Sequence, residues 1–193
     1  MSKLETNQVD PSTGTTLTLG TSGDTIAIPS GVTIANSGTA TGFGGTNTPA
    51  FLAHKTSNQE VTEGTDTKVT WDSAPIDTDS AFDTSNNRFV VPSGKAGKYM
   101  FNGSIQTSAV GQDEYQYGFC VFYKNGSRHS SQMFDCRNNN QRQIPIVFNQ
   151  LIDLAVSDYI EIYVSLGTSG SDERVAGDSS YIATWFSGYK IIE

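Results

Sequence analysis

The sequence predicts an all-β protein in two parts: a β-sandwich or jelly-roll head over residues 49–193, preceded by an extended β segment over residues 1–48. Only 17% of the 193 residues are charged, while Gly, Ser, Thr and Asn are abundant, as is typical of β-rich chains with many turns. From Pro49 onward, β-branched and aromatic runs of strand length recur between turn signals, and no helical period accompanies them. The composition changes near residue 48, since no aromatic residue precedes Phe43.

The first 48 residues place their apolar side chains in short alternating pieces between Gly, Ser, Asp or Pro turns. One such chain buries too little apolar surface to fold alone. The segment is therefore either disordered or wound together with other copies around a shared core, and the regular spacing favours an intertwined oligomeric stalk. The stalk core would consist of Leu17, Leu19, Ile26, Ile28, Val32 and Ile34. Residues 42–49, GFGGTNTP, are interpreted as a hinge.

The head is expected to contain nine strands. The Asn125-Gly126 pair predicts a tight hairpin, because both residues tolerate positive φ. Short strands at this spacing, with no helical stretch between them, indicate a sandwich or jelly roll. The expected strands lie near residues 50–54, 67–72, 87–92, 98–107, 115–123, 130–135, 144–152, 158–166 and 180–192.

Several of these strands are apolar on both faces. In FCVFY, Phe119, Val121 and Tyr123 point one way, while Cys120 and Phe122 point the other. In a single sandwich one face should contact water, so the outer face is expected to pack against another subunit. This is a second, independent indication of an oligomer.

The stretch SGKAGK, residues 93–98, has the composition of a phosphate-binding loop but not its spacing. Counting back from Gly97-Lys98, Pro92 occupies the first glycine position and Tyr99 replaces the hydroxyl residue. No helix pattern follows that would hold the anion. The net charge of −8 further argues against nucleic-acid binding. No run of about 18 apolar residues exists, so no membrane insertion is expected.

Groups for catalysis or metal binding are scarce. Only His54 and His129 are available as neutral-pH bases, they lack the spacing of a zinc site, and G-x-S-x-G is absent. We therefore expect no enzyme, cofactor or metal site. Cys120 and Cys136 either pair or remain free, and free buried thiols are favoured.

Two acidic groups offer oxygen ligands of the kind that calcium binds. Neither matches a calcium-loop motif, so solvated loop carboxylates are favoured. The groups are Asp77 with Asp79 and Asp83, and Asp172 with Glu173.

The aromatic spacing of the head resembles that of a known family. Trp71, Asp77, Phe82 and Phe89 keep the intervals of the C1q-like domain, a member of the tumour-necrosis-factor-like jelly-roll superfamily. Its Gly-x-Tyr-x-Phe is similar to Gly97 through Phe101, and VFYKNGS, LIDLAVSDYIEIYV and WFSGYKII resemble later strands. Gly103 and Ser157 depart from the family pattern, replacing an aromatic residue and a glycine. The residues expected to fill the core or a trimer contact are Trp71, Phe82, Phe89, Tyr99, Phe101, Phe119, Phe122, Phe186 and Tyr189.

The N-terminal LTLGTSGDTIAIPSGVTIANSGTATGFGG resembles stalk segments of tailed-bacteriophage structural proteins. Together the two resemblances imply a homotrimeric virion fibre on the tail or the capsid, docked to other virion proteins through its N-terminus. The number three comes from the family; the residues alone indicate only an oligomer.

The favoured function is that of a non-enzymatic phage fibre or tip protein whose head binds a host-surface receptor or glycan. The alternative is a purely structural role as a capsid head fibre, decoration protein or tail adaptor; a polysaccharide-cleaving fibre would need two facing carboxylates. Contacts are expected from the loops at residues 106–115, 137–143 and 167–178. Their arginines suit anionic sugars and their asparagines neutral ones. The candidate contact residues are Arg137, Asn139, Arg142, Asp172 and Arg174.

Overall fold

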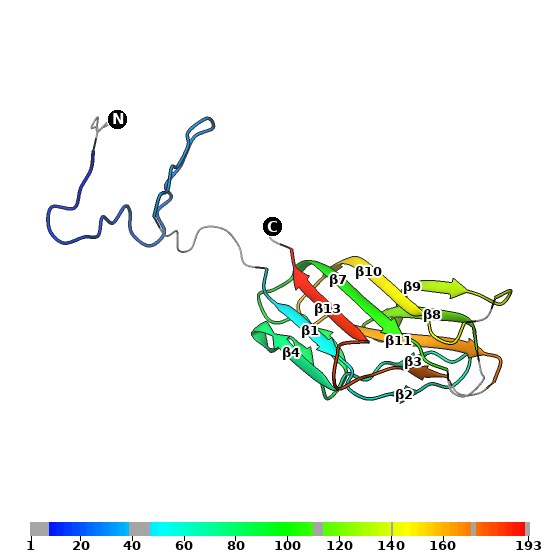
Figure 1. Cartoon of the computed structure of the whole chain (residues 1–193). Helices are drawn as coiled ribbons and strands as arrows, with labels where there is room; N and C mark the ends of the chain where they lie inside the picture. Colours follow the sequence, from blue (N-terminus) through cyan, green and yellow to red (C-terminus); the bar gives the residue numbers. More distant parts are fainter. Residues whose placement is uncertain (1–7, 39–46, 110–113, 140, 171–172, 192–193) are drawn as a thin grey trace. The chain divides into compact units, whose positions relative to one another are not determined.

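The computed structural model describes residues 8–38, 47–109, 114–139, 141–170 and 173–191 (Figure 1). The chain divides into two units, Met1–Phe43 and Gly44–Glu193. Within the described residues, every regular strand belongs to the second unit and the only helical element is a three-residue 3-10 turn, Thr78–Ser80. No described helix is long and apolar enough to span a membrane.

The head is a sandwich of two antiparallel sheets. The first sheet has the order β10-β7-β13-β1-β4, formed by Pro145–Leu154, Gly97–Gln106, Trp185–Lys190, Ala50–His54 and Ser73–Asp77. The second has the order β5-β6-β11-β8-β9, formed by Phe82–Asp83, Arg88–Val90, Tyr159–Thr168, Tyr115–Lys124 and Ser127–Asp135, with β3 (Thr67–Lys68) also paired to β11. A small ladder joins β12 (Arg174–Val175) to β2 (Gln59–Glu60). The predicted all-β sandwich is confirmed.

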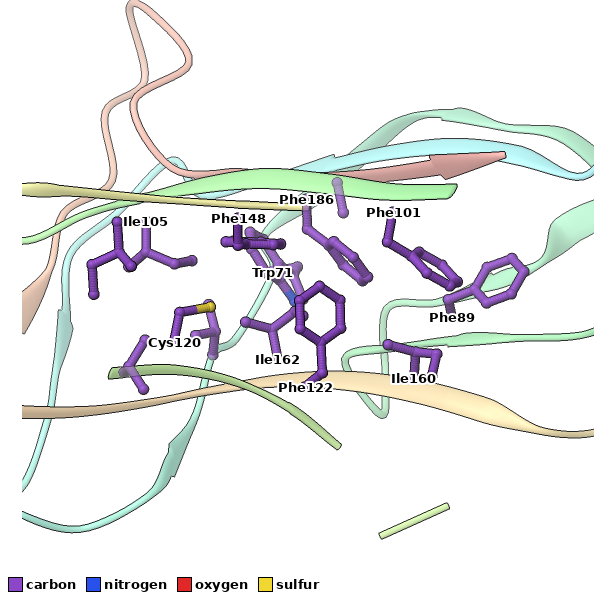
Figure 2. Close-up of a cluster of buried hydrophobic side chains, with 14 of the residues drawn as sticks. Trp71, Phe89, Phe101, Ile105, Cys120, Phe122, Phe148, Ile160, Ile162 and Phe186 are labelled. Carbon is purple, nitrogen blue, oxygen red and sulfur yellow. The ribbon is translucent and has the colours of Figure 1, made fainter. Parts of the chain in front are cut away.

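Aromatic side chains from both sheets fill the space between the layers, as Figure 2 shows. Phe51 stacks on Phe82 at 5.0 Å and on Phe89 at 5.1 Å, measured between ring centroids. Phe186 meets Phe51 edge-on at 4.9 Å, which is a favourable arrangement for the ring quadrupoles. These contacts join β1 and β13 of one sheet to β5 and β6 of the other.

Most of the expected strands occur close to their expected ranges. The hairpin at Asn125-Gly126 is confirmed, with φ of 53° and 75°, between β8 and β9. Phe82 and Phe89 pair across β5 and β6, on either side of one turn. The expected strand at 67–72 ends at Lys68, and that at 180–192 is confined to Trp185–Lys190.

Four short strands, β2, β4, β5 and β12, were not expected from the sequence. β4 carries Pro75 and an exposed Ile76, so the alternation that marks a strand is missing from SAPID. Pairing with β1 at the sheet edge stabilises it instead.

The doubly apolar strand at 115–123 is partly accounted for within one chain. Cys120 and Phe122 lie in the core, and Val121 on the outer face is also fully buried. The ring of Tyr123 stacks on that of Tyr163 at 4.0 Å, so these two tyrosines cover one another. Further along β8, Tyr117 and Phe119 on the same outer face are partly buried.

The N-terminal unit is extended between turns. Asp24 N donates to the carbonyl oxygen of Thr21 at 3.0 Å, and Val32 N donates to that of Pro29 at 3.2 Å. All six residues expected in the stalk core are exposed in the single chain, with Leu19 at 62% and Ile28 at 48%. Most of the expected hinge at 42–49 lies outside the described residues.

Candidate binding surface

The three loops expected to make contacts lie at one end of the sandwich. β7, β9 and β11 end there, at Gln106, Asp135 and Thr168. At the opposite end, Lys190 N donates to the carbonyl oxygen of Pro49 at 3.0 Å, where the chain enters the head. We call the loop end the apex; Figure 1 shows it at the end of the sheets away from the start of β1 and from the C-terminus.

Backbone hydrogen bonds join the three apical loops. Ala109 N donates to the carbonyl oxygen of Arg142 at 3.1 Å, and Ser108 N donates to that of Arg174 at 3.0 Å. Ser169 N donates to the carbonyl oxygen of Glu114 at 2.9 Å. The loops therefore support one another and do not protrude separately.

Tyr115 lies at the centre of this network, fully buried. Its hydroxyl donates to the carbonyl oxygen of Arg174 and accepts from Arg174 N, both at 3.0 Å. Desolvation raises the pKa of Tyr115 to about 12. The sequence predicts Tyr115 at the start of a strand but does not reveal this role, because its partner lies 59 residues away.

A buried carboxylate lies beneath the third loop. Glu173 is only 1% exposed, and its Oε1 accepts from the hydroxyl of Thr168 at 2.9 Å. Val61 N donates to the carbonyl oxygen of Glu173 at 2.9 Å. Glu173 thus connects the end of β11 to the segment after β2, because its carboxylate bonds to Thr168 and its backbone carbonyl bonds to Val61.

Two adjoining open hollows lie among the described residues of the apex. One, of about 710 Å³, is lined by Asp135, Cys136, Arg137, Asn138, Asn139 and Gln141. The other, of about 590 Å³, is lined by Ala109, Glu114, Gln141, Arg142 and Gln143. Gln141 borders both, so the second loop forms the wall between them.

Two of the three candidate arginines form ion pairs with carboxylates. Arg137 forms an ion pair with Asp135, and Nε of Arg174 lies 2.5 Å from Oε1 of Glu60. Arg142 shares its hollow with Glu114. Arg137 and Arg142 are exposed, whereas Arg174 is partly buried in β12.

The remaining candidate contacts are Asn139 and Asp172. Asn139 is exposed in the first hollow, and its backbone N donates to the carbonyl oxygen of Cys136 at 2.8 Å. Asp172 lies outside the described residues.

The acidic group at residues 77–83 is engaged by neighbouring groups. Asp77 Oδ1 accepts from the backbone N of Ala81 at 2.8 Å, and Asp79 pairs with Lys95 at 3.1 Å. Asp83 Oδ1 accepts from the backbone N of Asn86 at 3.0 Å. No cluster of three His, Cys, Asp or Glu side chains suited to a metal ion occurs among the described residues.

No disulfide joins Cys120 to Cys136, and only Cys120 is fully buried. Cys136 N donates to the carbonyl oxygen of Gln116 at 2.8 Å, which places it four residues along β8 from Cys120. That offset corresponds to about 13 Å in a strand, too far for a disulfide.

The aromatic residues expected in the core or the trimer contact separate into two groups. Phe119 is half-buried on the outer face of the second sheet, and Tyr189 is 39% exposed on that of the first. The other seven are buried in the core, namely Trp71, Phe82, Phe89, Tyr99, Phe101, Phe122 and Phe186.

Comparisons with known proteins agree with this architecture. No model of a protein family matches the chain. The chain is 28% identical over 137 residues to the phage-like element PBSX protein XkdV of Bacillus subtilis (strain 168). The matched region is 68% of this chain but 19% of that protein, so the chain spans less than a fifth of its relative's length. The globular domain of zebrafish complement 1qA protein superposes with a TM-score of 0.53 at 15% identity, covering 74% of this chain and 96% of that domain. The head therefore has the C1q-like jelly-roll fold that its sequence predicts, in a chain similar in sequence to a phage-element protein.

Proposed function

We propose that the protein is a non-enzymatic structural protein of a phage virion, a fibre or tip whose trimeric head binds a receptor or glycan on the host surface. The observation that carries this proposal is the gathering of three loops at the apex, at the end of the sandwich opposite Pro49. A head joined to the virion through the chain that precedes Pro49 presents the apex to its surroundings. Loops supported by a rigid sandwich are a common location for binding residues.

The similarity to a phage-element protein supports the virion assignment. The exposed apolar residues of the N-terminal unit support an intertwined stalk, because single chains rarely leave such residues in water at regular spacing. We propose that residues 1–48 form this stalk and dock on other virion proteins, and that residues 49–193 form the head.

A trimer contact is proposed on the outer face of the first sheet. Val147 and Leu151 on β10 are 65% and 52% exposed. Leu151 pairs with Met100, which pairs in turn with Tyr189, so an apolar row crosses three strands. Covering this row with a second copy would remove it from water. Three heads on one stalk would multiply weak single-site contacts by avidity.

The test uses the chain of residues 1–193 and the bacterium that its phage infects. Labelled protein is expected to bind these cells and to reduce phage adsorption in competition, but not to bind a resistant strain. Absence of both effects would contradict receptor binding. A tag on the C-terminus, located in virion micrographs, then distinguishes a tail tip from the structural alternative on the capsid or at a tail joint. Incubation with host polysaccharide is expected to release no new reducing ends.

A further inference from the structure

We propose that the ligand of the apex is an uncharged saccharide, held between the apolar strip of Tyr117, Phe119 and Met133 and the amide-lined hollow formed by Asp135–Asn139 and Gln141. This inference rests on the proposed receptor-binding function and specifies its ligand. Three features carry it: the polar groups of the hollow, the neutralised charge of its arginine, and the apolar strip at its edge.

The polar groups that line the hollow are mainly amides. Asn138, Asn139 and Gln141 are exposed there, and each amide both donates and accepts hydrogen bonds. Sugar hydroxyls also do both, so amides match them in either orientation. Gln141 Nε2 donates to the carbonyl oxygen of Asn139 at 3.0 Å, which helps to fix the loop before a ligand arrives.

The arginine of the hollow is already paired with a carboxylate. Nε of Arg137 lies 3.0 Å from both Oδ1 and Oδ2 of Asp135, and Nη2 also contacts Oδ2. Hydrogen bonds from Arg137 lower the pKa of Asp135 to about 2, so the pair remains ionised and neutral overall above that pH. An anionic ligand would have to displace Asp135, whereas an uncharged ligand would not.

An apolar strip begins at the edge of the hollow. Tyr117 pairs across the sheet with Asp135, and the guanidinium of Arg137 lies over its ring at 6.0 Å. Phe119 meets Tyr117 edge-on at 6.2 Å, and its cross-strand partner Met133 is 57% exposed. The strip thus lies beside hydrogen-bonding groups. A pyranose has one face of C–H groups and a rim of hydroxyls, which matches this combination.

The ring of Tyr117 is held in place by the strand beside it. Gly167 pairs with Tyr117, and a Cβ at Gly167 would lie 2.4 Å from Cε1 of that ring. Glycine therefore lets the ring lie against β11. A ring fixed before binding loses little rotational freedom on contact with a ligand.

The experiment measures competition for cell binding by the chain of residues 1–193. Surface polysaccharide from the host is separated by anion exchange into an uncharged and a charged fraction, and each is added to labelled protein and cells. We expect the uncharged fraction to compete and the charged fraction not to.

Tyr117→Ala should weaken binding roughly tenfold or more, as for a central aromatic contact. Tyr159→Ala is the matched control, since Tyr159 is another partly buried tyrosine with an arginine, Arg88, over its ring. Tyr159 pairs with Val90 at the end of β11 away from the apex, so its loss should leave binding unchanged.

A second variant tests the role of charge. Asp135→Asn keeps the size of the side chain but removes the negative charge that Arg137 pairs with, so the charged fraction should begin to compete, and added salt should reverse the effect. Competition by the charged fraction alone in the parent protein would overturn the inference. So would loss of binding after protease treatment of the cells. Failure of the parent protein to bind cells would instead contradict the proposed function, whereas cell binding without competition by the uncharged fraction would contradict only this inference.

Discussion

Gly103 on β7 lies directly against the ring of Phe148 on β10, its cross-strand partner: a Cβ at Gly103 would stand 2.1 Å from Cζ of that ring. It would also lie 2.6 Å from the carbonyl oxygen of Trp185. The C1q-like family carries an aromatic residue where this chain has Gly103. Here Phe148, reaching across from the neighbouring strand, occupies the space beside that position.

Gly103→Ala should therefore destabilise the head, by about 1–3 kcal/mol if both the ring of Phe148 and the backbone at Trp185 can shift and more if either cannot. The measurement is urea unfolding followed by near-UV circular dichroism. Ser104→Ala, at the next residue on the partly exposed outer face, serves as the control and should change stability little. Equal stabilities for the two variants would show that the residues around Gly103 accommodate the added Cβ without a loss of stability.

The apical network gives a second stability prediction. Tyr115→Phe removes the hydroxyl that bonds to both backbone groups of Arg174, leaving a buried donor and acceptor without that partner. We expect a loss of about 1–3 kcal/mol in the free energy of unfolding. Tyr181→Phe is the control, because Tyr181 is 65% exposed. Hydrogen exchange should also accelerate at the amides of Ser108 and Arg174. A Tyr115→Phe protein as stable and as protected as the parent would contradict the network.

The raised pKa values of two buried tyrosines predict that the protein loses stability at alkaline pH. The pKa of Tyr99 and that of Tyr115 are each raised from 10.0 to about 12, chiefly by desolvation. The folded state then binds more protons than the unfolded state between these values, so stability falls as the pH rises from about 10 to 12. Unfolding in urea at several pH values should show this decline. It should be shallower in Tyr99→Phe, and an identical pH slope in that variant would argue against the shift.

Several features of this fold were accessible from the sequence because they depend on local chemistry. Asn125-Gly126 specifies its own turn, and the spacing of Phe82 and Phe89 matches one short hairpin. β12 could not be predicted, because a strand of two residues is too short to show an alternation of apolar and polar side chains. Pairing with β2 stabilises it instead. The contact of Tyr115 with Arg174 joins positions distant in sequence, as does that of Arg137 with the ring of Tyr117. The sequence identifies the three loops as candidate contacts, but their shared end and their charge balance depend on tertiary structure.

The next prediction concerns the trimer contact that we propose on the outer face of the first sheet. Leu151→Glu would place a carboxylate in the apolar row with Met100 and Tyr189, and burying that charge against a second copy would be costly. Multi-angle light scattering should show trimers for the parent and a shift toward smaller species for the variant. Met133→Glu, on the outer face of the other sheet, is the control and should remain trimeric. The proposed interface would be wrong if both variants behaved alike.

The last prediction concerns the proposed stalk, residues 1–48. Leu19 and Ile28 alternate with small or polar neighbours and are exposed in the single chain, so winding three chains together would bury them. The double variant Leu19→Ser with Ile28→Ser should make residues 1–48 sensitive to protease while the head resists. Thr18→Ser with Thr33→Ser, at positions beside the apolar residues, is the control and should keep the parent's resistance. If the parent segment is digested as fast as the variant, then the chains are not intertwined. In that case the outer face of the first sheet would have to hold the trimer alone, and Leu151→Glu should give complete monomers.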